Sequence, residues 1–344
     1  MKYNKWHNGL LLLAAGLLVG CSADSTEQSV PDDAPKEIKI HVTDIASQTD
    51  ATRATIINNN TNLQSQNIRI DAYYHGTTTA HLSEAKLRYS SSWGFVDGSG
   101  NAISCFWPIE GSVHATAGMV SSLDFVGYAP YTKLSYIGTV SYTAANGPSF
   151  TCTNLPVTSA GQAAASLQEF LYAYATDQDY ADQVANSGIP LEFQHPFAKI
   201  TLQLKTSHRA IYNLNTIKFK SIKNNGTFTY GNNPQWTTTG STTDFTITVN
   251  EGIGADADFT SGQITAMNFP LIVLPQSLIA TDQIEVKLTW NSGDSESTYT
   301  FDNPVSTWQS GKSYNYTLDL LGDIKFSVTI DDWVEEDTKR NLRF

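Results

Sequence analysis

The sequence predicts an all-β protein that consists of two tandem antiparallel β-sandwich domains and a minor helix. Three observations lead to this prediction. Short segments in which apolar and polar residues alternate recur along the chain, as expected of strands that bury one face. Gly, Asn and Asp residues that favour turns separate these segments at the spacing typical of sandwiches and barrels. About 320 residues follow the leader sequence, which is more than one hydrophobic core normally covers.

Residues 1–20 have the pattern of a signal peptide. Lys2 and Lys5 precede the apolar run Leu10 to Val19, which is too short for a helix that crosses a bilayer of ~30 Å. The run ends in Leu18-Val19-Gly20-Cys21, which resembles the cleavage box of bacterial lipoproteins, so we expect Cys21 to carry acyl chains. Residues 21–35 would then be a lipidated tether that anchors the protein to a membrane. The alternative is an ordinary signal peptide in which Cys21 is incidental.

The N-terminal domain is predicted to span residues 36–186. Its first strand, residues 36–43, places Ile38, Ile40 and Val42 on one face. Residues 47–53 have no apolar periodicity and are predicted to be an exposed loop. Residues 163–184 fit a helix, although Tyr172 to Tyr174 fit a strand equally well. The other strands of this domain are predicted at residues 67–74, 86–89, 105–107, 123–128 and 139–142.

The turn Asn186-Ser187-Gly188 marks the boundary to a C-terminal domain, residues 187–344. The last strand, residues 323–330, places Ile324, Phe326, Val328 and Ile330 on one face, with the same period of two as the first strand of the chain. The preceding strands are predicted at residues 191–204, 216–220, 227–230, 244–249, 269–273, 284–290, 297–301 and 313–320.

The composition argues against nucleic-acid binding and against catalysis. Lys and Arg total 21 against 33 Asp and Glu, so the clustered cations that bind a phosphate backbone are missing. The seven histidines are scattered, and no nucleophile, acid-base or phosphate-loop motif is present. We therefore expect no enzymatic activity, no cofactor and no metal site. His195, between Phe193 and Phe197, is predicted to be a hydrogen-bonded core histidine.

Two features have alternative interpretations. Cys105 and Cys152 either form a disulfide in the exported protein or remain two separate buried thiols. Trp107-Pro108 and Trp236 either pack in a core or turn, which is the preferred interpretation, or form a platform on which sugars stack.

Seven local motifs follow one another over nearly the whole chain after the leader: Cys105-Phe106-Trp107-Pro108, Phe125-Val126-Gly127-Tyr128-Ala129-Pro130-Tyr131, Phe170-Leu171-Tyr172-Ala173, Leu191-Glu192-Phe193-Gln194-His195-Pro196-Phe197-Ala198-Lys199-Ile200, Leu274-Pro275-Gln276, Trp308-Gln309-Ser310-Gly311-Lys312-Ser313-Tyr314-Asn315-Tyr316 and Asp332-Trp333. Together they resemble the fimbrillin family, the pilin superfamily of Bacteroidetes-type fimbriae. The resemblance implies two transthyretin-like β-sandwiches, which agrees with the strands predicted above.

The resemblance also implies a structural subunit of an adhesive fimbrium on the cell surface. Such a subunit is exported as a lipoprotein precursor to the outer membrane and polymerises with other fimbrial subunits by strand exchange, after an Arg-specific surface protease has removed its first strand. Arg53-Ala54, in the predicted exposed loop after the first strand, is the matching position for cleavage.

Loss of the first strand would leave an apolar groove and unpaired backbone edges. The segment with Ile324, Phe326, Val328 and Ile330, or the tail beyond Trp333, is the predicted donor that fills such a groove in a neighbouring subunit. The alternative function, from a different class, is a monomeric surface lipoprotein that binds glycans through exposed aromatic side chains.

Overall fold

The computed structural model describes residues 35–43, 60–108, 122–158, 169–205, 213–252, 262–263, 271–279, 283–290, 293–319 and 325–333. The residues described between Lys36 and Trp333 belong to one compact unit. Cys21, Arg53, Ala54 and Ile324 lie outside the described residues, as does the tail after Trp333. None of the helices in the described part of the chain has the length and hydropathy needed to cross a membrane.

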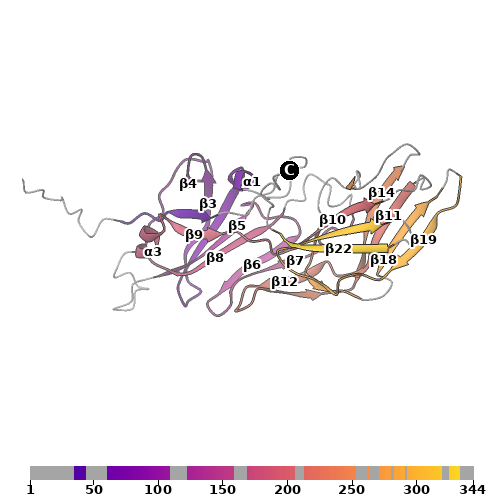
Figure 1. The fold of residues 1–344 in the computed structure, drawn as a ribbon. Coiled ribbons are helices and arrows are strands. Elements are labelled where there is room, and N and C mark those ends of the chain that lie inside the picture. The colour runs from indigo at the N-terminus through magenta and orange to yellow at the C-terminus, as the bar shows by residue number, and fades with distance from the viewer. Residues whose placement is uncertain are drawn as a thin grey trace, which may run out of the picture. The chain divides into compact units, whose positions relative to one another are not determined.

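A five-stranded antiparallel sheet forms the centre of the N-terminal half (Figure 1). Its order is β4-β3-β2-β5-β8, with the bounds Trp93–Val96, Ala80–Tyr89, Asn67–Tyr74, Leu123–Ala129 and Leu171–Gln178. Strand β5 is buried at all of its residues. Its side chains alternate between two hydrophobic cores, with Phe125 in one and Val126 in the other. Both faces of this sheet therefore need a cover.

One face is covered by a short parallel pair, β1 (Ile40–Thr43) and β9 (Ile189–Glu192). Together with Trp107 and Phe95, side chains of this pair close a core that we call the N-terminal core. Its members are Ile38, Ile40, Leu63, Ile68, Ile70, Ala72, Leu87, Phe95, Trp107, Leu123, Phe125, Ala129, Leu171, Ala173, Ile189, Leu191 and Phe193.

The other face packs on a four-stranded antiparallel sheet of order β13-β12-β7-β6, with the bounds Gln235–Thr239, Asn225–Thr229, Gly147–Cys152 and Ile137–Thr143. The hairpin β12-β13 comes from the C-terminal half of the sequence, and Phe228 of β12 lies opposite Phe150 of β7 with the rings stacked at 4.8 Å. Strands from both sides of residue 186 thus share one sheet. The domain boundary at this residue stays a prediction.

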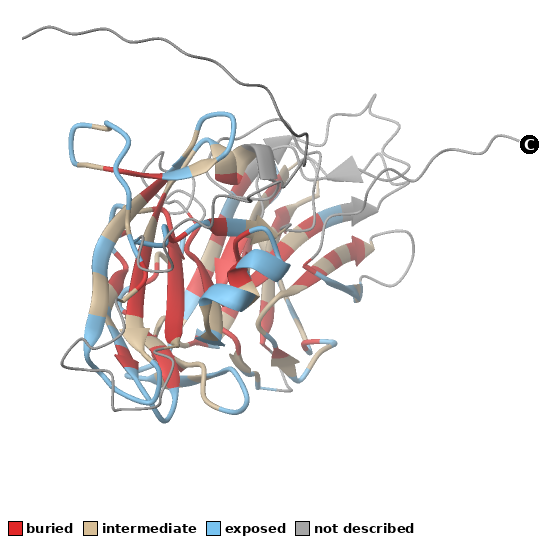
Figure 2. Ribbon diagram, turned by 90° about the vertical axis from the view of Figure 1, so that its left-hand side faces the viewer, coloured by how far each residue is buried: buried red, intermediate tan, exposed pale blue. Residues whose placement is uncertain are grey.

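The C-terminal half contains a sandwich of two further sheets. The first has the order β14-β11-β18-β19, with the bounds Thr243–Gly252, Asn213–Ile222, Ile284–Thr289 and Ser297–Phe301. The second has the order β15-β10-β21-β22, with β16 also on β10, and the bounds Gly262–Gln263, Ala198–Lys205, Lys312–Asp319, Lys325–Asp332 and Leu271–Val273. Strands β17 (Gln276–Ser277) and β20 (Thr307–Trp308) form a separate two-stranded antiparallel sheet. Figure 2 shows the buried stretches, in red, running along the strands.

The all-β prediction is confirmed, and the described part of the chain has two short helices, α1 (Asn60–Gln64) and α3 (Tyr180–Ala185). The segment that fitted either helix or strand contains both, since strand β8 is followed directly by α3. The strand predicted at residues 105–107 is not formed. This stretch makes one isolated bridge, between Phe106 and Glu37, because Trp107 turns into the core.

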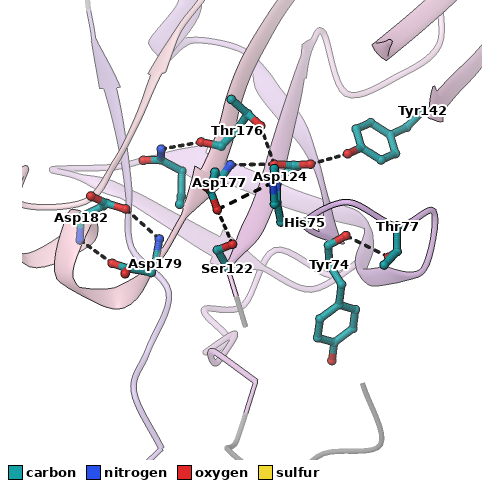
Figure 3. A network of polar contacts seen from close by, with 11 residues as sticks. Tyr74, His75, Thr77, Ser122, Asp124, Tyr142, Thr176, Asp177, Asp179 and Asp182 are labelled. Carbon is teal, nitrogen blue, oxygen red and sulfur yellow. Dashed lines mark hydrogen bonds and ion pairs between the residues drawn. The ribbon is translucent and has the colours of Figure 1, made fainter. Parts of the chain in front are cut away.

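A buried carboxylate connects four strands of the two N-terminal sheets (Figure 3). Asp124, 1% exposed, accepts hydrogen bonds from His75 Nδ1 at 2.9 Å, Thr176 Oγ1 at 2.8 Å, the Asp177 backbone N–H at 2.7 Å and the Tyr142 hydroxyl. Burial raises the pKa of Asp124, but these hydrogen bonds outweigh burial and lower it below its usual value. The hydrogen bond to Asp124 raises the pKa of His75.

We expect Asp124→Asn to lower the free energy of unfolding by about 3 kcal/mol at neutral pH, since it removes a charged acceptor from a buried network. Because the folded pKa of Asp124 is lowered, its contribution is present above the unfolded value of about 3.9 and is lost as the pH falls through the folded pKa. The raised pKa of His75 acts in the opposite sense, and its contribution is lost as the pH rises through the folded pKa above about 6.5. Urea unfolding between pH 3 and pH 8 measures the loss of the Asp124 contribution at low pH and of the His75 contribution at high pH.

Tyr142→Phe is the matched control, because it removes one of the four hydrogen bonds and keeps the carboxylate. We expect a loss of about 1 to 2 kcal/mol. Equal stability of Asp124→Asn and the unmodified protein at pH 7 would contradict this account of the network.

Candidate assembly site

The segment of residues 36–43 is held mainly through its backbone. On one side, the Ile38 N–H donates to Cys105 O at 2.7 Å, and the Trp107 N–H donates to Lys36 O at 2.9 Å. On the other side, the Ile189 N–H donates to Lys39 O at 2.8 Å, and the parallel pairing continues from Ile40 to Thr43 along β9. A two-stranded parallel pair is a minimal sheet, so this segment depends strongly on its other contacts.

One of these contacts is the side chain of Gln183 in helix α3. Gln183 is 5% exposed, and its Oε1 accepts hydrogen bonds from the Lys39 N–H at 2.8 Å and from Trp107 Nε1 at 3.0 Å. Its Nε2 donates to Glu37 O at 2.9 Å. The amide thus bonds to the backbone of residues 37 and 39, as a neighbouring strand would.

Helix α3 is fixed at its N-terminus by a capping box. The Asp179 side chain accepts from the Asp182 N–H at 2.9 Å, and the Asp182 side chain accepts from the Asp179 N–H at 3.0 Å (Figure 3). The same figure shows Asp177, two residues before the cap, bonded to Asp124 through its backbone and to Ser122 Oγ at 2.5 Å. The network around Asp124 therefore leads directly to the helix that carries Gln183.

The side chains of the segment follow the predicted alternation. Ile38 and Ile40 are 2% and 6% exposed in the N-terminal core, and Val42 is half-buried against it, whereas Lys39 and His41 are exposed. Burial of Ile38 and Ile40 contributes about 1.5 to 3 kcal/mol each. The strand-exchange role predicted for these residues stays a prediction.

The predicted donor segment forms strand β22 at the edge of its sheet. It pairs with β21 from Lys325 to Asp332, and no second partner strand occurs among the described residues. Phe326 and Val328 are half-buried against the C-terminal sandwich, with Phe326 edge-on to Phe301 at 5.3 Å, and Ile330 is 50% exposed. The apolar face of β22 is thus only partly covered.

Trp333, directly after β22, is buried between the two halves of the chain. Its ring stacks on His195 at 4.1 Å with an interplanar angle of 8°, and His195 is hydrogen-bonded to the fully buried Glu169. The Trp333 N–H donates to Gly311 O at 2.5 Å. The prediction that His195 is a hydrogen-bonded core residue is confirmed, and its ring also holds the end of β22.

Cys105 and Cys152 are free thiols in the structure. Cys105 packs against the N-terminal core and Cys152 lies in the core on the opposite face of the central sheet, so the disulfide alternative is not realised. Burial raises the pKa of both thiols, that of Cys152 to about 12, so both stay protonated at neutral pH. Among the described residues, no three His, Cys, Asp or Glu side chains are placed to hold a metal ion.

The two tryptophans of the sugar-platform alternative pack in cores instead. Trp107 is 7% exposed and lies edge-on to Phe125 at 5.7 Å. Trp236 is half-buried, lies 5.6 Å from Phe150 and donates from Nε1 to Pro196 O at 2.5 Å. The packing interpretation is confirmed for both.

Comparison with known proteins agrees with this fold. The sequence profile of a family described as Fimbrillin-like matches residues 52–333. The chain belongs to the fimbrillin-like family. No curated protein matches it.

Solved structures share the fold of this fimbrillin-like chain. A "putative cell adhesion protein" from Bacteroides uniformis has a TM-score of 0.51 at 16% identity, covering 88% of this chain and 99% of its own. A protein of the same description from Bacteroides ovatus has a TM-score of 0.50 at 17% identity, with the same coverage. The tip fimbrial protein Mfa3 from Porphyromonas gingivalis matches at a TM-score of 0.41 and 9% identity, over 86% of this chain and 100% of its own.

Two residues that contact the strand of residues 36–43 are not predicted from the sequence, Gln183 and Gly188. Gln183 follows the pair Asp179 and Asp182, whose spacing is that of a helix cap and is a usable signal for α3. Nothing local indicates that its amide faces the strand of residues 36–43, because that contact joins positions far apart in the chain. Gly188 was interpreted only as a turn residue.

We expect Trp333→Ala to lower the free energy of unfolding of the fimbrillin-like chain by about 3 kcal/mol, because it leaves a cavity beside His195. It should also speed backbone hydrogen exchange in residues 325–332, which Trp333 holds at their C-terminal end. Denaturant unfolding and exchange measured by mass spectrometry test both expectations.

Trp290→Ala serves as the control for this substitution. Trp290 is half-buried and contacts Tyr299 on the neighbouring strand, so we expect a loss of about 1 kcal/mol and unchanged exchange in residues 325–332. Unchanged exchange in this segment on replacing Trp333 would mean that the indole does not hold β22.

Proposed function

We propose that this chain is a non-enzymatic structural subunit of a surface fimbrium, exported as a lipoprotein with lipid on Cys21 and assembled by strand exchange after cleavage between Arg53 and Ala54. Membership of the fimbrillin-like family supports the fimbrial role. The leader with its Leu18-Val19-Gly20-Cys21 box supports export and anchoring to the outer membrane. The partners are other fimbrial subunits and an Arg-specific surface protease.

The observation that carries the proposal is the position of Ile38 and Ile40. They fill the N-terminal core from a segment that is joined to the rest of the unit after Thr43 only through the stretch that contains Arg53. Cleavage there would turn the segment into a separate peptide held by non-covalent contacts. Its departure would expose the apolar floor of the core and leave buried donors and acceptors unpaired, which favours refilling by another strand.

The donor on this proposal is the β22 segment of a second subunit. Phe326 and Val328 repeat at the same spacing as Ile38 and Ile40, and their apolar surface is only partly covered where they lie. Binding of Phe326 and Val328 in the vacated groove would bury the apolar face of β22 from one subunit and the exposed N-terminal core of the other. The tail beyond Trp333 is the second candidate for the donor.

We expect an Arg-specific protease to convert the purified precursor to a chain that begins with Ala54-Thr55-Ile56 and that polymerises into filaments. N-terminal sequencing identifies the start, and electron microscopy detects the filaments. Arg53→Lys keeps the charge and removes the cleavage specificity, so it should give neither product. Filaments from Arg53→Lys treated in the same way would count against processing at this position.

We expect the double substitution Phe326→Asp and Val328→Asp to stop filament formation, because two carboxylates cannot enter an apolar groove without a large desolvation cost. Ser327→Asp with Thr329→Asp is the matched control on the exposed face of the same strand and should leave polymerisation unchanged. Circular dichroism first verifies that each variant is folded. Normal filaments from the folded Phe326→Asp, Val328→Asp chain would remove β22 as the donor.

A further inference from the structure

The contacts of residues 36–43 divide into two kinds. Side chains enter the N-terminal core only at alternate positions, through Ile38 and Ile40, with Val42 half-buried. The contacts in between go to the main chain: Lys36 O, Glu37 O, Ile38 N, Lys39 N and Lys39 O each have a partner outside the segment. The exposed side chains of Glu37, Lys39 and His41 do not enter the core, and outside these two kinds of contact His41 Nδ1 lies within hydrogen-bond distance, 3.1 Å, of Asn186 O.

Among the described residues, Gln183 is the one side chain of a helix that takes part in this main-chain recognition. A carboxamide offers a donor and an acceptor side by side, which matches the C=O and N–H of residues 37 and 39 on one edge of an extended strand. Trp107 Nε1 occupies a second lone pair of Oε1 and fixes the direction of the amide. Since Gln183 is almost fully buried, an occupant that lacked these backbone groups would leave its amide unsatisfied.

The backbone of the occupant also passes unusually close to Gly188. This glycine has φ +142°, and a Cβ built on it would lie 2.9 Å from His41 N and 3.1 Å from Ile40 C. The groove is therefore shaped around a main chain at this point, and the close approach does not depend on which side chain the occupant carries at residue 41.

We propose that Gln183 is the residue of this groove that recognises the incoming strand: the amide that binds the main chain of residues 37 and 39 binds the main chain of the β22 segment of a second copy of this chain in the same way. The proposal rests on the strand-exchange function proposed above. Gln183 positions the occupant parallel to β9, and the two core positions filled by Ile38 and Ile40 receive its apolar side chains. Specificity lies in the spacing of the apolar residues, and the amide supplies sequence-independent affinity.

The first test measures backbone hydrogen exchange by mass spectrometry on the full chain. Gln183→Met keeps the length of the side chain and removes both hydrogen bonds to the segment, so exchange in residues 36–43 should become about tenfold faster. Exchange in strand β5 should stay unchanged. Gln178→Met is the matched control, because the Gln178 amide donates to Thr176 O within its own strand. Unchanged exchange in residues 36–43 of Gln183→Met would overturn the proposal.

The second test uses the protease-treated chain and a fluorescent peptide with the sequence of residues 36–43. Replacing Lys39 of the peptide by Ala should change its affinity less than twofold, whereas methylation of the Lys39 backbone nitrogen should weaken it about tenfold. Protein carrying Gln183→Met should bind both peptides equally weakly. Equal binding of the methylated and unmethylated peptides to the unmodified protein would also overturn the proposal.

Neither test needs a polymer, so the two proposals can fail separately. If Gln183→Met speeds exchange in residues 36–43 and weakens peptide binding but the unmodified chain never forms filaments, Gln183 recognises the strand and the fimbrial function is wrong. If filaments form at the same rate with Gln183→Met, the fimbrial function holds and Gln183 does not recognise the incoming strand.

Discussion

The arrangement of this protein depends on one constraint: its central N-terminal sheet is apolar on both faces, and both must be covered. One cover is a complete four-stranded sheet that shares strands with the C-terminal half of the sequence. The other consists of the pair β1 and β9, Trp107 and helix α3. The second cover has few hydrogen bonds of its own between strands, so its stability comes from two buried isoleucines and from backbone contacts to neighbouring loops. On the function proposed above, this is the part of the fold that a strand of another subunit would complete after cleavage.

Polar contacts fix the frame around this cover independently of the segment that fills it. Asp124 ties β5 to β2, β6 and β8 through four hydrogen bonds, and the last of these strands leads through Asp177 into the capped helix α3. The helix that carries Gln183 is therefore held by contacts that do not involve residues 36–43. A groove that keeps its shape when emptied loses less free energy to reordering when a new strand enters.

Period-two patterns predicted the strands of this chain well where one face is buried, as at residues 36–43 and 323–330, because alternation follows directly from the pleat. They failed at β7, which begins with Gly147-Pro148, two residues that disfavour a strand, and at β13, whose half-exposed polar residues have no apolar alternation. The sharing of one sheet by β7 and β12 was not predictable, because pairing between distant segments leaves no local signal. The same holds for the amide of Gln183 and for the stack of His195 on Trp333.

The two ends of the chain carry the same apolar spacing but differ in how well they bury it. Ile38 and Ile40 are fully buried, whereas Phe326 and Val328 are half-buried and Ile330 is half-exposed. A transfer of β22 into the groove would therefore gain apolar burial, at the cost of its ladder with β21 and of the Trp333 stack on His195. Residues 334–344 would avoid this cost, but their apolar side chains are confined to Val334, Leu342 and Phe344, with a charged stretch in between. The groove requires two apolar residues spaced two positions apart and close passage of the main chain at Gly188. The segment with Ile324, Phe326, Val328 and Ile330 contains three such apolar pairs. On this mechanism, release of Trp333 from His195 is the step that commits a subunit to act as a donor.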